Sequence, residues 1–397
     1  MSTLRVLSTA HGGEGGYDAD MQTENTLPTR LLLGPGPSNA HPEVLAAMAQ
    51  PLIGHLDPAF LALLDGVQTD LRTLFGTDNR FTLPLSAPGS AGMEACLVNL
   101  LEPGDRIVIG ANGVFGRRMS EVAHRAGAQV TRIDSPWGEP VDEAGVLKAI
   151  QDESPDVVAF VHAETSTGVR QDPEVIARHA REAGSLVVLD CVTSLAGLTL
   201  ELDRWGIDAA YSGSQKCLSC SPGLSPLSFS ERALERVRAR KVPVQSWFLD
   251  VSLLDGYYGT ERVYHHTAPI SALYGLQAGV RRALAEGMPA RSARHLEAAE
   301  YLIEKVQPLG FEPLVRSEYR LPPLTTLRIP ENLGAEGESA LRRRLLTQHG
   351  IEVGGGLGEL AGQVWRVGLM GENARLECVD RLVWALDKEL NSNPGTE

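Results

Sequence analysis

The chain has 397 residues, 43% of them hydrophobic and 22% charged, which is the length and composition of a folded protein with a large domain and one or two smaller parts. Asp and Glu total 50 against 36 Lys and Arg, and the resulting net charge of −14 argues against binding to the phosphate backbone of nucleic acid. No run of about 18 apolar residues is present, so we expect no contact with the interior of a membrane.

The first 27 residues are predicted to form a flexible N-terminal arm. Residues 1–27 are rich in glycine and acidic side chains and show no hydrophobic periodicity, so they offer little surface to bury. From residue 31 the chain reads LLLGPGPSNAHPEVLAAM, which is a short apolar run, a Gly/Pro turn and a helix that starts at a proline. The folded part of the chain is expected to begin there.

Short apolar runs alternate with amphipathic segments between about residues 89 and 230. The runs predict strands at residues 107–109, 129–133, 157–161, 186–190, 209–212 and 224–229, with helices separating the first four. Continuous apolar strands between helices are typical of a mostly parallel sheet that is covered on both faces. We therefore predict an α/β fold, with a large domain spanning residues 28–290.

A smaller α+β domain is predicted at residues 291–397. Helical patterns cover about residues 271–307, and a strand (TTLRI), a helix (ESALRRRLLTQHG), a strand (QVWRVGL) and a long terminal helix then follow. The glycine-rich stretch at 354–358 lacks the strand-to-helix context of a dinucleotide site, and we expect it to be a mobile loop.

Polar residues follow the ends of three predicted strands, which is where open α/β sheets gather function. Asp190 ends the strand SLVVLD, Lys216 follows AAYSGSQ, and Ser166 lies just beyond VVAFVH. Taken singly, such residues are often turn formers or exposed loop cations. Together, an acid and a lysine suit a cofactor held as a Schiff base, which needs an amine for its aldehyde and a carboxylate for its ring nitrogen.

The segment SAPGSAGMEACLVNLL is a turn of small residues that opens a helix. Such a turn presents unpaired N–H groups and the positive end of the helix dipole to an anion such as phosphate. A capped, closely packed helix remains the alternative. The chain has no G-x-x-x-x-G-K-[ST] motif, which disfavours a P-loop nucleotide enzyme.

Two pairs of residues invite a metal interpretation that we do not adopt. Cys217 and Cys220 form a C-x-x-C without a second ligand pair, and the adjacent His265 and His266 rarely face one ion from a regular element. We predict no metal site. The five cysteines are odd in number and widely spread, so we expect reduced thiols and, with no signal-peptide pattern at the start, a cytoplasmic protein.

These segments together resemble the class V, fold-type-I aminotransferases, which depend on pyridoxal 5′-phosphate (PLP). The similarity is greatest to the alanine:glyoxylate and serine:glyoxylate (serine:pyruvate) enzymes. It runs from LLLGPGPSN at 31–39 to VWRVGLMG at 364–371, and rests on GPGPSN, LEPGDRIVIGANGVFG, ETSTGV, LDCVTSLAG, GIDAAYSGSQK, YHHT and WRVGLMG. The combination is specific, and it implies the PLP-dependent transferase fold of type I.

The resemblance implies roles for residues around the cofactor ring. By matched position, Lys216 is the Schiff-base lysine and moves a proton between the substrate Cα and the cofactor, and Asp190 pairs with the ring nitrogen. Val192 is expected to pack against the ring. Phe115 stands where the family stacks an aromatic side chain on the ring, although several relatives have tryptophan there.

The resemblance also implies how the cofactor phosphate is held. The expected contacts within one chain are Gly89, Ser90, Ala91 and Gln215. Tyr264 and Thr267, in YHHT, match residues that complete the phosphate site of the neighbouring subunit. The family pattern therefore implies a homodimer.

For the substrate, Arg366 in WRVG matches the arginine that grips the carboxylate, a task suited to a planar guanidinium. Ser166 is expected to assist on that carboxylate and to contact the cofactor. His55 lies in the N-terminal region that family members use to shape substrate choice, and a plain loop histidine is an equal alternative. The implied activity is transfer of the amino group of alanine or serine to glyoxylate or pyruvate in a ping-pong cycle.

Three alternatives stay open. The ureidoglycine:glyoxylate aminotransferases look similar, but tend to have asparagine where this chain has Tyr264. Cysteine desulfurases share the fold and need a mobile cysteine, whereas Cys378 falls inside the predicted terminal helix. A catalytically silent binding protein on the same scaffold is disfavoured by the presence of Lys216, Asp190 and Arg366.

Overall fold

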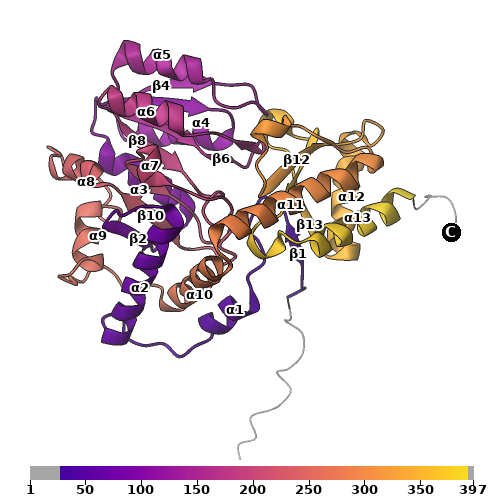
Figure 1. Ribbon diagram of the computed structural model, residues 1–397, viewed down its shortest axis with the longest axis horizontal. Coiled ribbons are helices and arrows are strands. Elements are labelled where there is room, and N and C mark those ends of the chain that lie inside the picture. The colour runs from indigo at the N-terminus through magenta and orange to yellow at the C-terminus, as the bar shows by residue number, and fades with distance from the viewer. Residues whose placement is uncertain (1–26, 392–397) are drawn as a thin grey trace, which may run out of the picture.

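The computed structural model describes residues 27–391 (Figure 1). The predicted arm lies outside these residues except for Leu27. In Figure 1 a large sheet with its helices occupies the left of the molecule, and a second sheet with α12 and α13 occupies the right. No helix of the described part is long and apolar enough to cross a bilayer.

The large sheet has seven strands in the order β2-β10-β9-β8-β5-β3-β4. Only β10 runs antiparallel to its neighbours, so the predicted mostly parallel α/β sheet is confirmed. The six predicted strands are all present, and β2 was not predicted. The bounds are β2 Phe81–Leu85, β3 Arg106–Ala111, β4 Gln129–Asp134, β5 Val157–Val161, β8 Leu186–Asp190, β9 Ala209–Tyr211 and β10 Ser225–Phe229.

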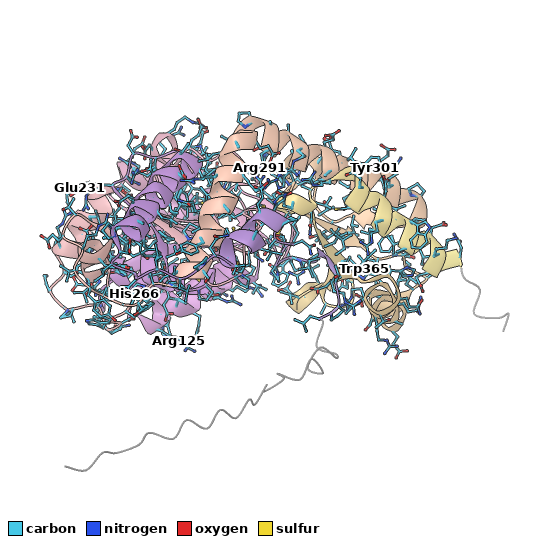
Figure 2. The ribbon with its side chains drawn as sticks, turned by 90° about the horizontal axis from the view of Figure 1, so that it is seen from below. Arg125, Glu231, His266, Arg291, Tyr301 and Trp365 are labelled. Carbon is cyan, nitrogen blue, oxygen red and sulfur yellow. The ribbon has the colours of Figure 1, made fainter. Side chains whose placement is uncertain are left out.

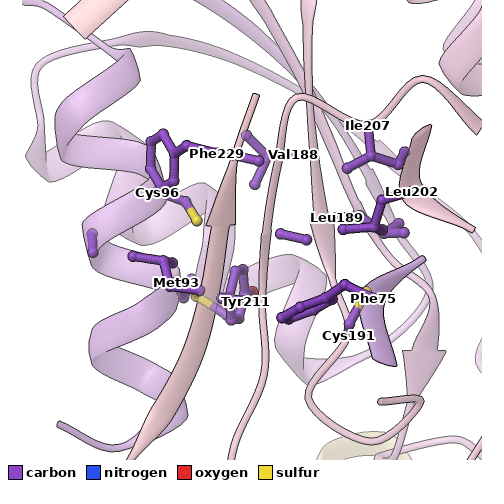
Figure 3. Close-up of a cluster of buried hydrophobic side chains, with 14 of the residues drawn as sticks. Phe75, Met93, Cys96, Val188, Leu189, Cys191, Leu202, Ile207, Tyr211 and Phe229 are labelled. Atoms are coloured by element: carbon purple, nitrogen blue, oxygen red, sulfur yellow. The ribbon is translucent and has the colours of Figure 1, made fainter. Parts of the chain in front are cut away.

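Helices cover the large sheet, and β5 and β8 are buried along their whole length. In Figure 3 side chains from α2, α3 and the central strands pack together, among them Phe75, Met93 and Leu189. The helices of this part are α1 Pro42–Met48, α2 Pro58–Phe75, α3 Gly89–Leu100, α4 Val114–Arg125, α5 Glu143–Glu153, α6 Glu174–Glu182, α7 Leu202–Trp205, α8 Glu231–Arg238, α9 Val251–Tyr258 and α10 Ile270–Glu286. A hairpin of β6 Ala163–Glu164 and β7 Val169–Arg170 follows β5.

Local sequence explains why α2 begins and ends where it does. Asp57 caps the first turn, where its Oδ1 accepts a hydrogen bond from the Ala59 N–H at 2.8 Å, and Pro58 occupies the first helical position. The helix ends at Gly76, whose φ of 62° is left-handed and favours glycine.

The second sheet has five strands in the order β1-β13-β14-β12-β11 and a hydrophobic core of its own. The buried Leu302, Leu345 and Trp365 belong to that core. The bounds are β1 Leu31–Leu33, β11 Glu312–Pro313, β12 Leu324–Arg328, β13 Ile351–Gly355, β14 Val364–Gly368, α11 Met288–Val306, α12 Gly334–His349 and α13 Leu376–Asn391, with short 3₁₀ turns at Gln307–Leu309, Ser317–Tyr319, Gly358–Leu360 and Gly371–Asn373.

Two expectations about this sheet differ from the structure. The segment Leu31–Leu33, at the start of the predicted large domain, pairs in parallel with β13 of the second sheet. The remaining bounds of the two predicted domains stay a prediction. The stretch 354–358 is not wholly a loop, because Gly354 and Gly355 extend β13 and pair with β14. A side chain at Gly354 would overlap Pro35, which explains the glycine there.

The two parts meet where α10 turns into α11. Arg291 is buried at this junction, as Figure 2 shows, and donates hydrogen bonds to the carbonyls of Ala196 at 2.7 Å and Cys217 at 2.6 Å. Its remaining guanidinium nitrogen pairs with Glu286. The junction therefore contacts the backbone directly after Lys216.

Candidate active site

A cavity of about 110 Å³ lies at the carboxyl ends of β8 and β9, against the first turns of α3 and α4. Seven predicted site residues line it: Gly89, Ser90, Phe115, Asp190, Val192, Gln215 and Lys216. Met93, Arg118 and Tyr211 also line it, and sequence reasoning did not single them out.

Asp190 is buried at the end of β8. Its Oδ2 accepts a hydrogen bond from the Tyr211 hydroxyl at 2.7 Å, and its Oδ1 accepts one from the Val192 N–H at 2.8 Å. Burial raises the pKa of Asp190 to about 7, against the lowering effect of these two hydrogen bonds. A carboxylate with only neutral donors around it favours a cation beside it, such as a protonated ring nitrogen.

Lys216 reaches the same cavity from the loop after β9, and its Nζ donates to the Pro35 carbonyl. The pKa of Lys216 is lowered to about 8, chiefly by burial and in part by the charge of Arg366, while Cys217 and Asp190 oppose the shift. Gly36 has a φ of 110°, and a side chain there would overlap the lysine. The GPGPSN motif therefore leaves room for an amine that is readily deprotonated.

The first turn of α3 fits a phosphate. Pro88 caps the helix without a side-chain hydrogen bond, and Gly89 and Ser90 line the cavity with N–H groups that no acceptor in the described residues occupies, whereas the N–H of Ala91 bonds to the Pro88 carbonyl. The side-chain oxygen of Gln215 is buried without a hydrogen-bond partner. A half-turn of this amide would present its NH₂ group to an anion. The residues present therefore suit the phosphate of PLP, and the ring would lie between Asp190 and Lys216.

Arg366 lies in β14, between β12 and β13. Its Nε donates to the Gly355 carbonyl at 2.8 Å and its Nη1 to the Thr165 carbonyl at 3.2 Å. Within residues 27–391, Nη2 takes part in no hydrogen bond, so one edge of the guanidinium is available to a carboxylate. Burial lowers the pKa of Arg366 to about 10, far above neutral pH, so the side chain stays charged.

Ser166 is not among the residues that line the cavity. Its hydroxyl donates to Oε1 of Glu164 at 2.5 Å and accepts from the Val114 N–H at 2.9 Å. Glu164 lies in the ETSTGV motif, yet the sequence did not mark it, because its two partners on α4, Phe115 and Gly116, are distant along the chain. The direct substrate contact expected of Ser166 stays a prediction.

Tyr264 and Thr267 do not line this cavity. Both are exposed, with 59% of Tyr264 accessible, and the Tyr264 ring contacts the ring of His55 at 5.4 Å between centroids.

The thiols near the site are occupied by structural contacts. Cys217 donates to the Thr193 carbonyl and Cys220 to the Leu218 carbonyl, and burial raises the pKa of each to about 12. Cys378 lies in α13, as predicted, rather than on a mobile loop.

A sequence model of the class-V aminotransferases matches residues 31–368. The chain belongs to this family. It is therefore a transaminase that uses PLP on the type I fold, as the motifs predicted.

Several relatives match over nearly the whole chain. Alanine–glyoxylate aminotransferase of Drosophila melanogaster is 37% identical, over 92% of this chain and 94% of its own. (S)-Ureidoglycine–glyoxylate transaminase of Bacillus subtilis is 35% identical, over 94% of each. The crystal structure of alanine–glyoxylate aminotransferase from Nostoc sp. has 50% identity and a TM-score of 0.90, with 93% of this chain and 98% of that one covered.

Proposed function

We propose that the chain transfers the amino group of alanine or serine to glyoxylate or pyruvate. The observation that carries the proposal is one small cavity with the Lys216 amine and the Asp190 carboxylate on its wall. Relatives named for alanine and glyoxylate, one of them 50% identical, support the choice of substrates.

The described residues supply each other element of the reaction. Bound PLP would link to the amino nitrogen and accept the electrons that remain when Cα loses its proton. Asp190 keeps the ring nitrogen protonated. Lys216, as a neutral amine, would take the Cα proton of the substrate and hold it for return. Arg366 grips the substrate carboxylate, and Phe115 covers the ring and excludes water.

Small donors suit this site. Among the described residues, the cations Lys216 and Arg118 line the cavity, and Arg366 lies near enough to lower the pKa of Lys216. A donor with a second carboxylate would depend on Arg118, which lies over the Phe115 ring at 5.1 Å. We therefore place alanine and serine ahead of acidic donors.

Ureidoglycine is the second candidate donor, because the Bacillus subtilis relative matches with similar identity and coverage. Measured kcat/KM values separate the two candidate functions. The donors to compare are alanine, serine, aspartate and ureidoglycine, each with glyoxylate and with pyruvate as acceptor. We expect alanine or serine with glyoxylate to give the highest value. A higher kcat/KM for ureidoglycine would replace the proposal with the second candidate.

We further propose that the enzyme is a homodimer. Large apolar side chains are exposed in and after α1, before and in α9, and before α10. These segments touch through the His55–Tyr264 ring contact and a hydrogen bond from the Tyr257 hydroxyl to the His55 carbonyl. The exposed members are Leu45, Leu52, Ile53, Leu56, Trp247, Leu253, Val263 and Tyr264.

A patch of this kind in a monomer would be unusual, and burial against a second copy would cover it. Light scattering of the purified protein is expected to give twice the mass of the 42.7 kDa chain. Tyr264→Ala should weaken PLP binding in that dimer by removing a phosphate contact. A stable monomer with full activity would refute both statements.

The cellular location is also a proposal. All five cysteines are free thiols, which supports a reducing compartment, and we propose the cytoplasm.

A further inference from the structure

Glu164 has contacts that the reaction does not yet explain. Its side chain is fully buried, and its carboxylate accepts four hydrogen bonds: from the Ser166 N–H at 3.1 Å, the Ser166 hydroxyl at 2.5 Å, the Phe115 N–H at 3.1 Å and the Gly116 N–H at 3.4 Å. All four partners donate, as an ionised carboxylate requires.

The contacts on α4 form an N-cap supplied by another segment. Gly113 precedes the helix and has no side chain to cap it. The first three helical N–H groups, of Val114, Phe115 and Gly116, are satisfied instead by Ser166 and Glu164. The position of the Phe115 ring therefore depends on the loop that carries Glu164.

The same loop orients Arg366. The Thr165 carbonyl, between Glu164 and Ser166, accepts the hydrogen bond from Nη1 of Arg366. The negative charge of Glu164 also acts on this guanidinium and favours its charged form. One three-residue loop thus contacts both the helix that carries the ring-stacking side chain and the arginine expected to grip the substrate.

We propose that Glu164 is a positioning residue that fixes the places of the Phe115 ring and the Arg366 guanidinium around the cofactor. The inference rests on the proposed function for the roles of those two side chains. Glu164 touches neither substrate nor cofactor and acts through its hydrogen bonds to α4 and through its own loop.

Glu164→Gln is the principal variant. The amide keeps the volume and one acceptor, but its NH₂ group would face a donor on one side, either Ser166 or α4. We expect KM for both amino donor and oxo acid to rise at least about tenfold, since both carry a carboxylate for Arg366. We also expect the visible circular dichroism of bound PLP to change, because the Phe115 ring shifts against it.

Gly113→Ala tests the same contact without altering any hydrogen-bonding side chain. The φ of Gly113 is 176°, which any residue adopts, but a Cβ there would overlap both the Ser166 hydroxyl and the Glu164 carboxylate. The substitution should therefore move the loop that carries Glu164 away from α4. It should raise KM for both substrates and change the circular dichroism of bound PLP, as Glu164→Gln does. This variant also keeps the proposal testable if Glu164→Gln fails to fold.

Asp142→Ala is the matched control. Asp142 caps α5 through a 3.0 Å hydrogen bond from the Gly145 N–H, and its loss should lower the thermal midpoint of unfolding. We expect neither KM nor the circular dichroism to change. If Glu164→Gln and Gly113→Ala behave like Asp142→Ala, or lose only kcat, the positioning role is overturned. The dichroism of bound PLP needs no substrate, so this result is separable from a failure of the alanine or serine assignment.

Discussion

Asp190 has no charged partner among its hydrogen bonds, because both oxygens accept from neutral groups. Asp190→Asn keeps the shape but removes the charge that would hold a ring nitrogen protonated. We expect kcat to fall by about three orders of magnitude or more, equivalent to about 4 kcal/mol in the barrier. Steady-state kinetics measures the fall, and an unchanged thermal midpoint shows that the fold persists. Near-normal turnover would remove Asp190 from the mechanism.

Tyr211 supports the same carboxylate from β9, in contact with Met93 and the core around it (Figure 3). Sequence reasoning found Asp190 because an acid at a strand end is a recognisable pattern. Tyr211 has no such pattern, since its hydroxyl meets Asp190 only when β8 and β9 pair. Glu164 was missed for the same reason, as its helix partners lie 48 and 49 residues away.

The lowered pKa of Lys216 has a direct kinetic consequence. Only the neutral amine attacks an aldehyde, so the fraction able to react rises with pH up to the pKa of about 8 and is constant above it. Attachment of pyridoxal to the cofactor-free protein, followed by absorbance, should rise about tenfold per pH unit below that value. Lys216→Arg should abolish it. A midpoint near the ordinary lysine pKa of about 10.4 would contradict the burial argument.

At the scale of elements, the loop between β1 and α1 shapes the space around Lys216. Gly36→Ala combines a left-handed φ of 110° with overlap of the lysine side chain. We expect the variant to retain less than about a tenth of the normal PLP content, read as absorbance of bound cofactor per chain.

Gly184→Ala is the matched control for that substitution. Gly184 has a φ of 88°, but no atom lies within 4 Å of the position a Cβ would take. It should lose about 1–2 kcal/mol of stability from the backbone alone and keep its cofactor. Equal PLP content in both variants would mean that Gly36 matters only for its conformation.

The elements that could be predicted are those whose own residues specify them. The run 157–161 is apolar throughout and the run 186–190 is apolar up to its final Asp190, and the strands there have those same bounds. β1, β11 and β13 were not predicted, because β1 and β11 have only three and two residues, β13 ends in two glycines, and each strand is defined by its pairing with a distant segment. The same holds for the cap of α4, which lies in a different segment from the helix.

At the scale of the whole molecule, two buried histidines predict acid sensitivity. Burial lowers the pKa of His295 to about 3 and that of His162 to about 4. Unfolding restores both to about 6.5, so the unfolded chain binds more protons below that pH and stability falls as pH falls. When the pH falls from 7 to 5, each of these histidines should lower the free energy of unfolding by about 2 kcal/mol.

Urea unfolding at pH 7, 6 and 5 measures this loss. His295 lies in α11, where it accepts a hydrogen bond from the Gly371 N–H at 2.9 Å and bonds the Arg291 carbonyl at 2.7 Å. His295→Gln should be less stable at pH 7 but lose less on acidification than the unaltered protein. An equal loss in both proteins would show that His295 does not contribute.

The pairing of β1 with β13 links residues near the two ends of the chain. During synthesis Leu31–Leu33 leaves the ribosome long before its partner Ile351–Val353 is made. The loop that follows β1 and borders Lys216 therefore gains its anchor only after β13 has been translated. Nascent chains that stop before β13 should not capture the vitamin B6 cofactor.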